Sequence, residues 1–340
     1  MIDLRGFQRG LLLIVTLFVL SACAAASANT GSTPQQAAGA QPGVALPLVI
    51  KAQPTAIPTA TNLPTATATA TATPPPVWRF VVLGDTRTSG FDPPQVTKDI
   101  VAKASSANPE ITLAVGDLIL SKSTPTDVDT QWQNWRAAVQ PLGKGASIPD
   151  WLLVTPGNHD VESAAWAIDR MAAAFPELPT NGPSGLERLA YRKDYGNVRF
   201  ISIVSERYKD AHRIDDQLDW LETQLQNNPQ KYTIVFSHDP AYPFGAHINS
   251  SLDAYPAARD KLWSLLKQYK VTAYIAGHEH LYYRSVHDGV AQLIIGTSGS
   301  SLYPIDISFY HYAVAEVSAE HISFVIYDSS GTERDRFVLP

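Results

Sequence analysis

The sequence predicts an α/β fold in which two mixed β-sheets pack together with helices on the outside. From Arg79 to His280, β-rich apolar runs alternate with amphipathic stretches of helical period, which is typical of largely parallel sheets covered by helices. After Gly289 the rhythm changes, and strands follow one another with only turn residues between them, as in an antiparallel meander. A sandwich of two mixed sheets accommodates both halves.

Turn residues and helical patterns bound the individual elements. Strands are expected over Arg79–Asp85, Ile111–Asp117, Asp150–Asp160, Val198–Ser205, Lys231–Asp239 and Val271–His280. Helices are expected over Pro94–Ser106, Asp129–Val139, Val161–Phe175, Asp215–Gln226 and Ala258–Tyr269. The late strands are expected over Val290–Ser300, His311–Ser318, His321–Asp328 and Arg334–Leu339. In the second helix, Trp132, Trp135 and Val139 recur at the spacing of one helical face.

The composition is that of an ordinary globular protein. The chain has 340 residues, 45% of them apolar, and a formal net charge of -6. Its length suffices for one large domain or two small ones. No basic excess suggests a nucleic-acid partner.

The N-terminus has the pattern of an export signal. Arg5 and Arg9 precede Gly10–Leu20, an apolar run of eleven residues that is short for a membrane span and fits a secretory signal. The next stretch, "LSAC", resembles the lipobox of bacterial lipoproteins, which implies cleavage before Cys23 and lipidation of its sulfur. An uncleaved helical anchor is the alternative. Both interpretations predict export, and the first predicts a lipid anchor on the outer face of the cell membrane.

Residues 23–76 are expected to form a disordered tether between the anchor and the folded part. From Ala24 to Pro76 the chain is rich in Ala, Thr, Pro, Gln and Gly, and Lys51 is its only charge. Such a segment buries too little apolar surface to offset the entropy of ordering it, and its prolines keep it extended. The sequence therefore divides into a signal peptide (1–22), a linker (23–76) and one folded domain (77–340).

Five of the expected strands end in polar side chains that can bind a metal ion. These ends are Gly84-Asp85, Gly116-Asp117, Gly157-Asn158-His159-Asp160, Ser237-His238 and Gly277-His278-Glu279-His280. Ligands of open α/β sheets bind beyond the carboxyl ends of the strands, and a glycine before four of the five allows a sharp bend and a close approach. We therefore expect two carboxylates, one carboxamide and three histidines to converge at one edge of a sheet.

This ligand set fits divalent ions such as Mn²⁺, Zn²⁺ or Fe²⁺ and lacks the thiolates of soft sites. Six groups are too many for one tetrahedral ion and suit two ions that share a carboxylate. Taken singly, a Gly-Asp pair is more often a turn or a helix cap, and a lone histidine is more often structural. Their joint occurrence, each at a strand end, favours a metal centre.

The ordered motifs resemble those of the calcineurin-like metallophosphoesterase family. They are Asp85, "GD" at 116–117, "GNHD" at 157–160, "SH" at 237–238 and "GHEH" at 277–280, and the resemblance covers nearly all of residues 77–340. It implies a four-layer α-β-β-α sandwich and two divalent ions (Mn, Fe or Zn) that share Asp117. It further implies that Asn158, His238 and His278 complete one metal position, and that Asp85 and His280 serve the other.

The resemblance gives His159 a different role. That position lies near the leaving-group oxygen, where it donates a proton or stabilises charge, and an imidazole suits this task because its pKa lies near neutrality. Asp160 would either orient His159 or act as a helix N-cap.

The first motif departs from the family pattern. A histidine usually stands two residues after its aspartate, but here that residue is Arg87, and a guanidinium cannot bind a metal. One position is thus a ligand short; water, His247, His212 or Thr86 could fill the gap, or the ion binds loosely. Arg87 could clamp a phosphate oxygen, replace part of a missing metal's charge, or pair with Asp85 in a degenerate site. We favour the first use and count Arg87 with His159 as catalytic.

Purple acid phosphatases, another branch of the family, recruit a tyrosine three positions after the aspartate of the second motif. The chain has Leu120 at that position, which argues against a tyrosinate–iron(III) centre.

The sequence therefore predicts an exported enzyme that hydrolyses a phosphomonoester, a phosphodiester or a nucleotide through metal-activated water. The alternative is a non-catalytic surface binding protein with a degenerate site; Arg87 favours it, whereas Asn158, His159 and the complete "GHEH" motif argue against it. A serine hydrolase is disfavoured because no Gly-x-Ser-x-Gly elbow opens a helix.

Overall fold

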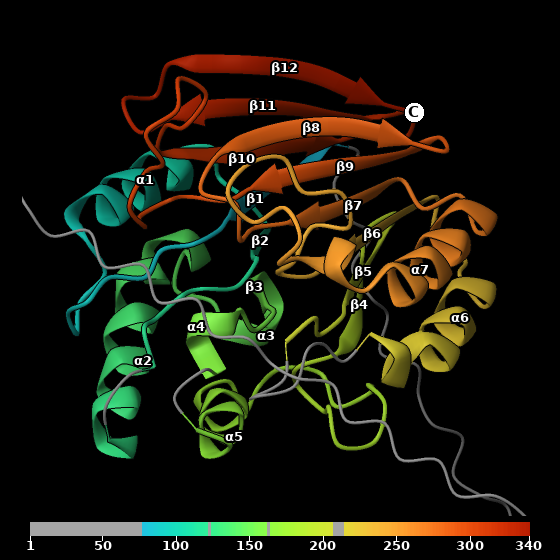
Figure 1. Ribbon diagram of the computed structural model, residues 1–340. Helices are drawn as coiled ribbons and strands as arrows, with labels where there is room; N and C mark the ends of the chain where they lie inside the picture. The colour runs from blue at the N-terminus through green and yellow to red at the C-terminus, as the bar shows by residue number, and fades with distance from the viewer. Residues whose placement is uncertain (1–76, 122–123, 162–163, 207–213) are drawn as a thin grey trace, which may run out of the picture. The chain divides into compact units, whose positions relative to one another are not determined.

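Two mixed sheets of six strands each form the centre of the fold (Figure 1). The computed structural model describes residues 77–340 except 122–123, 162–163 and 207–213. The first sheet has the order β12-β11-β10-β1-β2-β3 and the second has the order β4-β5-β6-β7-β9-β8. The strands are β1 Trp78–Leu83, β2 Ile111–Ala114, β3 Leu152–Val154, β4 Tyr191–Tyr195, β5 Val198–Ser202, β6 Tyr232–Phe236, β7 Ala273–Ala276, β8 Tyr282–His287, β9 Val290–Ile295, β10 His311–Val317, β11 Ile322–Asp328 and β12 Glu333–Leu339.

Helices cover the outer face of each sheet. They are α1 Gln95–Ser105, α2 Pro125–Val139, α3 Ile148–Trp151, α4 Asn158–Val161, α5 Trp166–Ala174, α6 Leu218–Gln226 and α7 Pro256–Gln268, with 3-10 turns at Gln140–Gly143, Asp215–Gln217 and Leu252–Ala254. In Figure 1, α1 and α2 lie on the side of the first sheet, and α6 and α7 on the side of the second. The predicted four-layer α-β-β-α sandwich of two mixed sheets is confirmed.

The side chains of a strand alternate between the two faces of its sheet. The inner faces of the two sheets form the main core, and the outer faces pack against helices. On β6, Ile234 and Phe236 belong to this core, whereas Val235 packs in a second cluster with residues of α6 and α7. Phe80 of β1 meets Phe200 of β5 edge to face, with ring centroids 5.4 Å apart. A strand buried on both faces reads as a continuous apolar run, which is why these strands were predictable.

The strands that sequence reasoning missed are the edge strands of the second sheet. β4 and β8 end that sheet on either side, and most of their residues are only half-buried or exposed. Neither strand therefore has a continuous apolar run. The late strands also divide differently from the prediction: β10, β11 and β12 form the expected antiparallel meander, but β9 pairs in parallel with β7 in the other sheet.

Two helices differ from their predicted bounds for local reasons. α2 begins at Pro125 rather than near 129, because Thr124 and Asp127 form a capping box: the Asp127 backbone N–H donates to Thr124 Oγ1 at 3.3 Å, and Asp127 Oδ2 accepts the Thr124 backbone N–H at 3.1 Å. The helix predicted over Val161–Phe175 is found as the shorter α5, and the "GNHD" motif, expected at the end of a strand, begins the short helix α4.

The predicted signal peptide, Cys23 and the linker lie outside the described residues. In the described part of the chain, no helix combines the length and the apolar composition that crossing a membrane requires.

Candidate metal centre

The five predicted strand ends meet at one place in the structure. β1, β2 and β3 are parallel neighbours in the first sheet, and β6 and β7 are parallel neighbours in the second. Buried hydrogen bonds join the loops that follow them: the His278 backbone N–H donates to Asp85 Oδ2 at 3.0 Å, and His238 Nδ1 lies 2.8 Å from the carbonyl oxygen of Val115. The predicted residues therefore converge between two sheets rather than at the edge of one.

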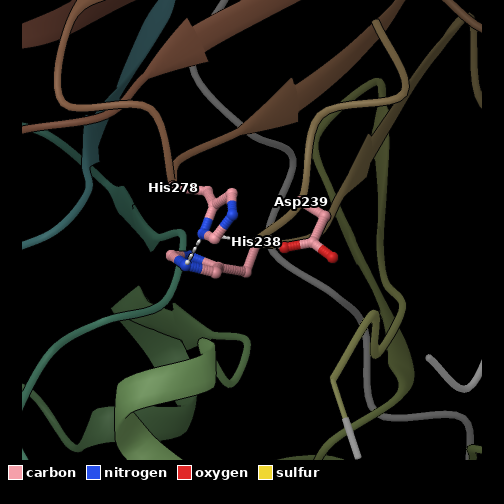
Figure 2. A group of neighbouring side chains, drawn as sticks. All are labelled: His238, Asp239 and His278. Atoms are coloured by element: carbon pink, nitrogen blue, oxygen red, sulfur yellow. Dashed lines mark hydrogen bonds and ion pairs between the residues drawn. The ribbon is translucent and has the colours of Figure 1, made fainter. Parts of the chain in front are cut away.

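The four side chains of the first predicted metal position gather around His238 Nε2. This nitrogen lies 3.3 Å from Asn158 Oδ1 and 3.2 Å from His278 Nδ1. It lies 3.4 Å from Asp117 Oδ1. Atoms bound to a common divalent ion at about 2.0–2.2 Å are spaced by about 3.0–3.4 Å, so this arrangement fits one ion. The two imidazole rings meet edge to face, at an interplanar angle of 75°, and Figure 2 shows the contact between their nitrogens.

Backbone carbonyls fix the orientation of two of the imidazoles. His238 Nδ1 donates to the carbonyl oxygen of Val115 at 2.8 Å, and His280 Nδ1 donates to that of Ser301 at 2.6 Å. Because a carbonyl can only accept, each Nδ1 carries the hydrogen and each Nε2 keeps the lone pair that a metal requires. Ser301 follows the "GTSGS" turn, so this turn orients a predicted ligand.

The second predicted metal position also forms a group. Ligand atoms of Asp85, Asp117 and His280 lie within 4.8 Å of one another, and His280 Nε2 is 3.5 Å from Asp85 Oδ1. Asp85 is fully buried, and its Oδ1 has no hydrogen-bond partner among the described residues. A buried carboxylate oxygen without a donor is unfavourable unless a cation binds it, so this position fits a metal ion too.

The two buried carboxylates differ in their electrostatic surroundings. Burial raises the pKa of Asp85 well above its usual value, and the nearby Asp117 acts in the same direction. Burial alone would also raise the pKa of Asp117, but His238, His159 and Arg87 together hold it well below its usual value. A divalent cation beside Asp85 would lower its pKa and favour the ionised form.

Three of the predicted ligand residues have a left-handed backbone. The φ angles are +47° at Asp85, +54° at Asp117 and +71° at His278, a region that residues with side chains seldom adopt and that recurs at functional sites. The glycine before His278 serves a close approach, because a Cβ at Gly277 would lie 2.4 Å from Asp85 Oδ2. The sharp bends are thus made largely by the ligand residues themselves.

Arg87 pairs with the carboxylate that both metal positions share. Its Nε donates to Asp117 Oδ2 at 3.0 Å, with 22% of the Arg87 side chain and 2% of the Asp117 side chain exposed. This corrects one of the three uses considered for Arg87, because the ion-pair partner is Asp117 rather than Asp85. The other guanidinium nitrogens of Arg87 have no acceptor among the described residues, which leaves them accessible to a phosphate oxygen.

His159 lies beside the same carboxylate. Its backbone N–H donates to Asp117 Oδ1 at 2.9 Å, its Nε2 is 3.9 Å from Asp117 Oδ2, and 22% of its side chain is exposed. A ring that is next to the metal ligands and open to solvent can exchange a proton with a bound substrate.

Asp160 does neither of the two tasks considered for it. Its Oδ1 accepts the backbone N–H groups of Leu118 and Ile119, each at 2.9 Å, and its Oδ2 accepts that of Gly157 at 2.9 Å. Asp160 also lies inside α4, so it is not the N-cap. It joins the loops after β2 and β3 and so fixes the relative positions of the predicted ligands Asp117 and Asn158.

The side chains considered for the missing ligand are otherwise engaged or outside the described residues. Thr86 Oγ1 donates to the carbonyl oxygen of Leu118 at 3.2 Å and accepts from Trp135 Nε1 at 2.8 Å. His247 lies against His278, a member of the first group, with ring centroids 4.0 Å apart, and burial lowers the pKa of His247 to about 4. His212 falls in the segment that is not described.

Two acidic residues near the first metal position were missed. Asp239 lies beside His238 and His278 (Figure 2), with Oδ1 3.9 Å from His278 Nδ1. Burial, together with the negative charge of Asp239 and a hydrogen bond to it, raises the pKa of Glu206 well above its usual value. The signal for Asp239 was present in "SHD", where an acid directly follows a predicted ligand.

Tyr303 is a further residue that sequence reasoning missed. Its ring stacks on His280 with centroids 4.8 Å apart and an interplanar angle of 15°. It lies in the turn region after β9, where the sequence has no motif that would single it out.

Comparison with known proteins places these motifs in a family. Residues 79–282, more than half of the chain, match the Calcineurin-like phosphoesterase family. The chain is 26% identical to tartrate-resistant acid phosphatase type 5 of Sus scrofa over 270 residues, which cover 72% of this chain and 74% of the relative. It is 26% identical to purple acid phosphatase 23 of Arabidopsis thaliana over 196 residues, covering 53% and 40%.

The chain is also 28% identical to the glycerophosphodiester phosphodiesterase GpdQ of Enterobacter lignolyticus over 134 residues, covering 38% of this chain and 45% of the relative. It thus spans less than half the length of the Arabidopsis and Enterobacter relatives.

Solved structures share the fold. Purple acid phosphatase PPD1 of yellow lupin superposes with a TM-score of 0.62 at 19% identity, covering 77% of this chain and 53% of that one. A dimetal phosphatase of Danio rerio gives 0.59 at 15% identity, covering 78% and 99%. With the family match, the strand-end motifs and the two ligand groups in agreement, the chain belongs to the calcineurin-like phosphoesterase family and is a hydrolase of phosphate esters.

Proposed function

We propose that the chain binds two divalent ions, of Mn, Fe or Zn, and hydrolyses a small-molecule phosphate ester outside the cytoplasm. The observation that carries this proposal is the spacing around His238 Nε2, where oxygen and nitrogen ligand atoms lie 3.2–3.4 Å away. When bound, divalent ions polarise the phosphoryl group and supply a nucleophilic water near neutral pH.

The side chains around the two groups would position the substrate and move its proton. Arg87, held by Asp117 through Nε, offers its remaining N–H groups to an equatorial phosphate oxygen, where charge develops in the transition state. His159, on the other oxygen of Asp117 through its backbone, donates a proton to the leaving-group oxygen.

Both monoesters and diesters are candidate substrates. The relatives include proteins named as acid phosphatases and one named as a glycerophosphodiester phosphodiesterase. We therefore propose phosphate esters as the substrate class, nucleotides included.

The proposed location follows from the N-terminal motif. The lipobox-like "LSAC" supports cleavage before Cys23 and attachment to the outer face of the cell membrane. A lipidated residue with more than one acyl chain would anchor the domain stably. Cys23→Ala should shift the protein from the membrane fraction to the exported soluble fraction, and an unchanged distribution would contradict the lipid anchor.

The enzymatic proposal is tested with metal-loaded protein and two esters, p-nitrophenyl phosphate and bis(p-nitrophenyl) phosphate. Turnover with at least one of them, lost on chelation and restored by Mn²⁺, Zn²⁺ or Fe²⁺, is expected. Asn158→Ala should abolish most of the turnover and lower the metal content. Metal content near zero in the wild type after loading, with no turnover of either ester, would overturn the proposal in favour of a non-catalytic binding protein.

A further inference from the structure

We propose that Arg87 makes the two metal positions unequal: the position at Asn158, His238 and His278 binds its ion tightly, whereas the position at Asp85 and His280 binds weakly. Arg87 would act as a resident cation on Asp117 that competes with the second ion. This inference rests on the proposed function, since it concerns how the same centre is loaded.

The two oxygens of Asp117 have different partners. Oδ1 lies 3.4 Å from His238 Nε2 and accepts the His159 backbone N–H at 2.9 Å. Oδ2 accepts Arg87 Nε at 3.0 Å. A guanidinium therefore already satisfies one oxygen of the shared carboxylate, whereas the other oxygen faces the imidazole of His238, which is itself a predicted metal ligand.

The ion pair between Arg87 and Asp117 is strengthened by its burial. The Asp117 side chain is 2% exposed and the Arg87 side chain 22%, so solvent screens the pair much less than it screens a surface salt bridge. Charge-assisted hydrogen bonds of this kind are stronger than neutral ones. An ion that uses Asp117 Oδ2 must displace Arg87 or bind beside its positive charge.

The two metal positions also differ in the number of protein ligands, which again favours tighter binding at the first. The first position offers four protein side chains when Asp117 is counted, and the second offers three: Asp85, Asp117 and His280. The residue that would supply the fourth ligand by sequence position is Arg87, which brings positive charge instead. Asp85 and Asp117 already have part of their negative charge neutralised by Arg87, so a second ion gains less electrostatic energy than the first.

The experiment measures how many ions bind, independently of catalysis. Chelated protein is dialysed to equilibrium against a series of Mn²⁺ concentrations, and bound metal per chain is determined by elemental analysis. The wild type should fill one position first and the second only at a Mn²⁺ concentration at least about tenfold higher, the factor expected from a charged hydrogen bond.

Three variants sharpen the measurement. Arg87→Gln keeps a hydrogen-bond donor but removes the charge. It should reduce the ratio of the two Mn²⁺ dissociation constants. Arg87→Lys keeps the charge and should retain the unequal loading, which makes the inference testable even if the glutamine variant folds poorly. Arg170→Gln is the matched control, because Arg170 forms an ion pair with Asp129 elsewhere on the protein, and it should behave as the wild type.

Two equal affinities in the wild type, or an unchanged ratio of affinities in Arg87→Gln, would overturn the inference. If that protein still hydrolyses esters, the proposed function stands and only the role of Arg87 falls. Failure of every variant and of the wild type to bind any ion would overturn the proposed function itself and this inference with it.

Discussion

The two sheets contribute different kinds of ligand to the metal centre. The loops after β1, β2 and β3 of the first sheet supply the oxygen donors Asp85, Asp117 and Asn158, and the loops after β6 and β7 of the second supply the imidazoles His238, His278 and His280. The oxygen set carries the negative charge that attracts a cation, whereas the imidazoles bind through lone pairs fixed by tautomer. Charge and directional geometry are thus divided between the two halves of the sandwich.

Each sheet also orients the ligands of the other. The carbonyl of Val115, after β2, holds the ring of His238, and the backbone N–H of His278, after β7, holds the carboxylate of Asp85. Neither half therefore presents its ligands correctly without its neighbour. The metal centre therefore belongs to the interface between the sheets and is sensitive to changes on either side.

The largest effect is expected from the side chain that both metal positions share. Asp117→Asn keeps the shape and removes the charge, so metal content should fall at both positions and turnover by more than about 100-fold. Elemental analysis and hydrolysis of p-nitrophenyl phosphate measure the two effects. Asp129→Asn, on a partly exposed ion pair, is the control; full metal content in Asp117→Asn would contradict a shared carboxylate.

His159 tests whether catalysis can be separated from metal binding. His159→Ala should lower turnover by about 10²- to 10⁴-fold while leaving metal content unchanged, and the loss should be smaller for a p-nitrophenyl ester, whose leaving group hardly needs a proton. His321→Ala should change turnover less than about twofold, since His321 lies between β10 and β11, where its backbone N–H donates to Ser318 Oγ and its carbonyl accepts the Ser318 N–H. Metal loss in His159→Ala would make His159 a ligand instead.

A glycine substitution probes the close contact between the sheets. A Cβ at Gly277 would lie 2.4 Å from Asp85 Oδ2, so Gly277→Ala should destabilise the fold by about 1–3 kcal/mol and weaken the metal position of Asp85. Gly90→Ala is the control, because its nearest atom is 3.9 Å from an added Cβ. Urea unfolding of the chelated protein and a Mn²⁺ titration report the two effects, and equal behaviour of the two variants would argue against a tight contact.

An effect on stability alone is expected from an imidazole of the first sheet that is not a predicted ligand. Burial lowers the pKa of His311 from its usual 6.5 to about 4, so between these values the unfolded chain binds a proton that the folded chain does not. The free energy of unfolding should therefore decrease as the pH falls from 6.5 to 4, by on the order of 3 kcal/mol at most. His311→Gln should flatten this dependence in urea unfolding of chelated protein; an unchanged pH slope would assign the dependence to other groups.

The fold and the gathering of the predicted site residues could be foreseen because both depend on strands with continuous apolar runs. Asp85, Asp117, Asn158, His238 and His278 each follow such a run, and the structure brings them together. The edge strands β4 and β8 could not be foreseen, because an edge strand exposed to solvent has no such run. The sequence also did not predict that the ligands come from two sheets, because the spacing of motifs does not determine the order of the strands.

The neighbours of the ligands were the least predictable part of the site. The partner of Arg87 could not be read from the sequence, where Asp85 is two residues away and Asp117 is thirty, yet the fold places Asp117 at 3.0 Å. Likewise, Tyr303, which lies after β9, stacks on His280, which lies after β7. These partners depend on contacts between segments that are distant in the chain, and the local sequence does not predict such contacts.

The left-handed backbone at Asp85, Asp117 and His278 restricts which residues these positions can accept. Asp, Asn and His are enriched several-fold among non-glycine residues with positive φ, and Asp and His are also common metal ligands. A β-branched or bulky residue there would strain the turn as well as remove the ligand. Replacement by such a residue therefore lowers folding stability as well as metal binding, so the backbone itself disfavours many of the substitutions that would remove a ligand.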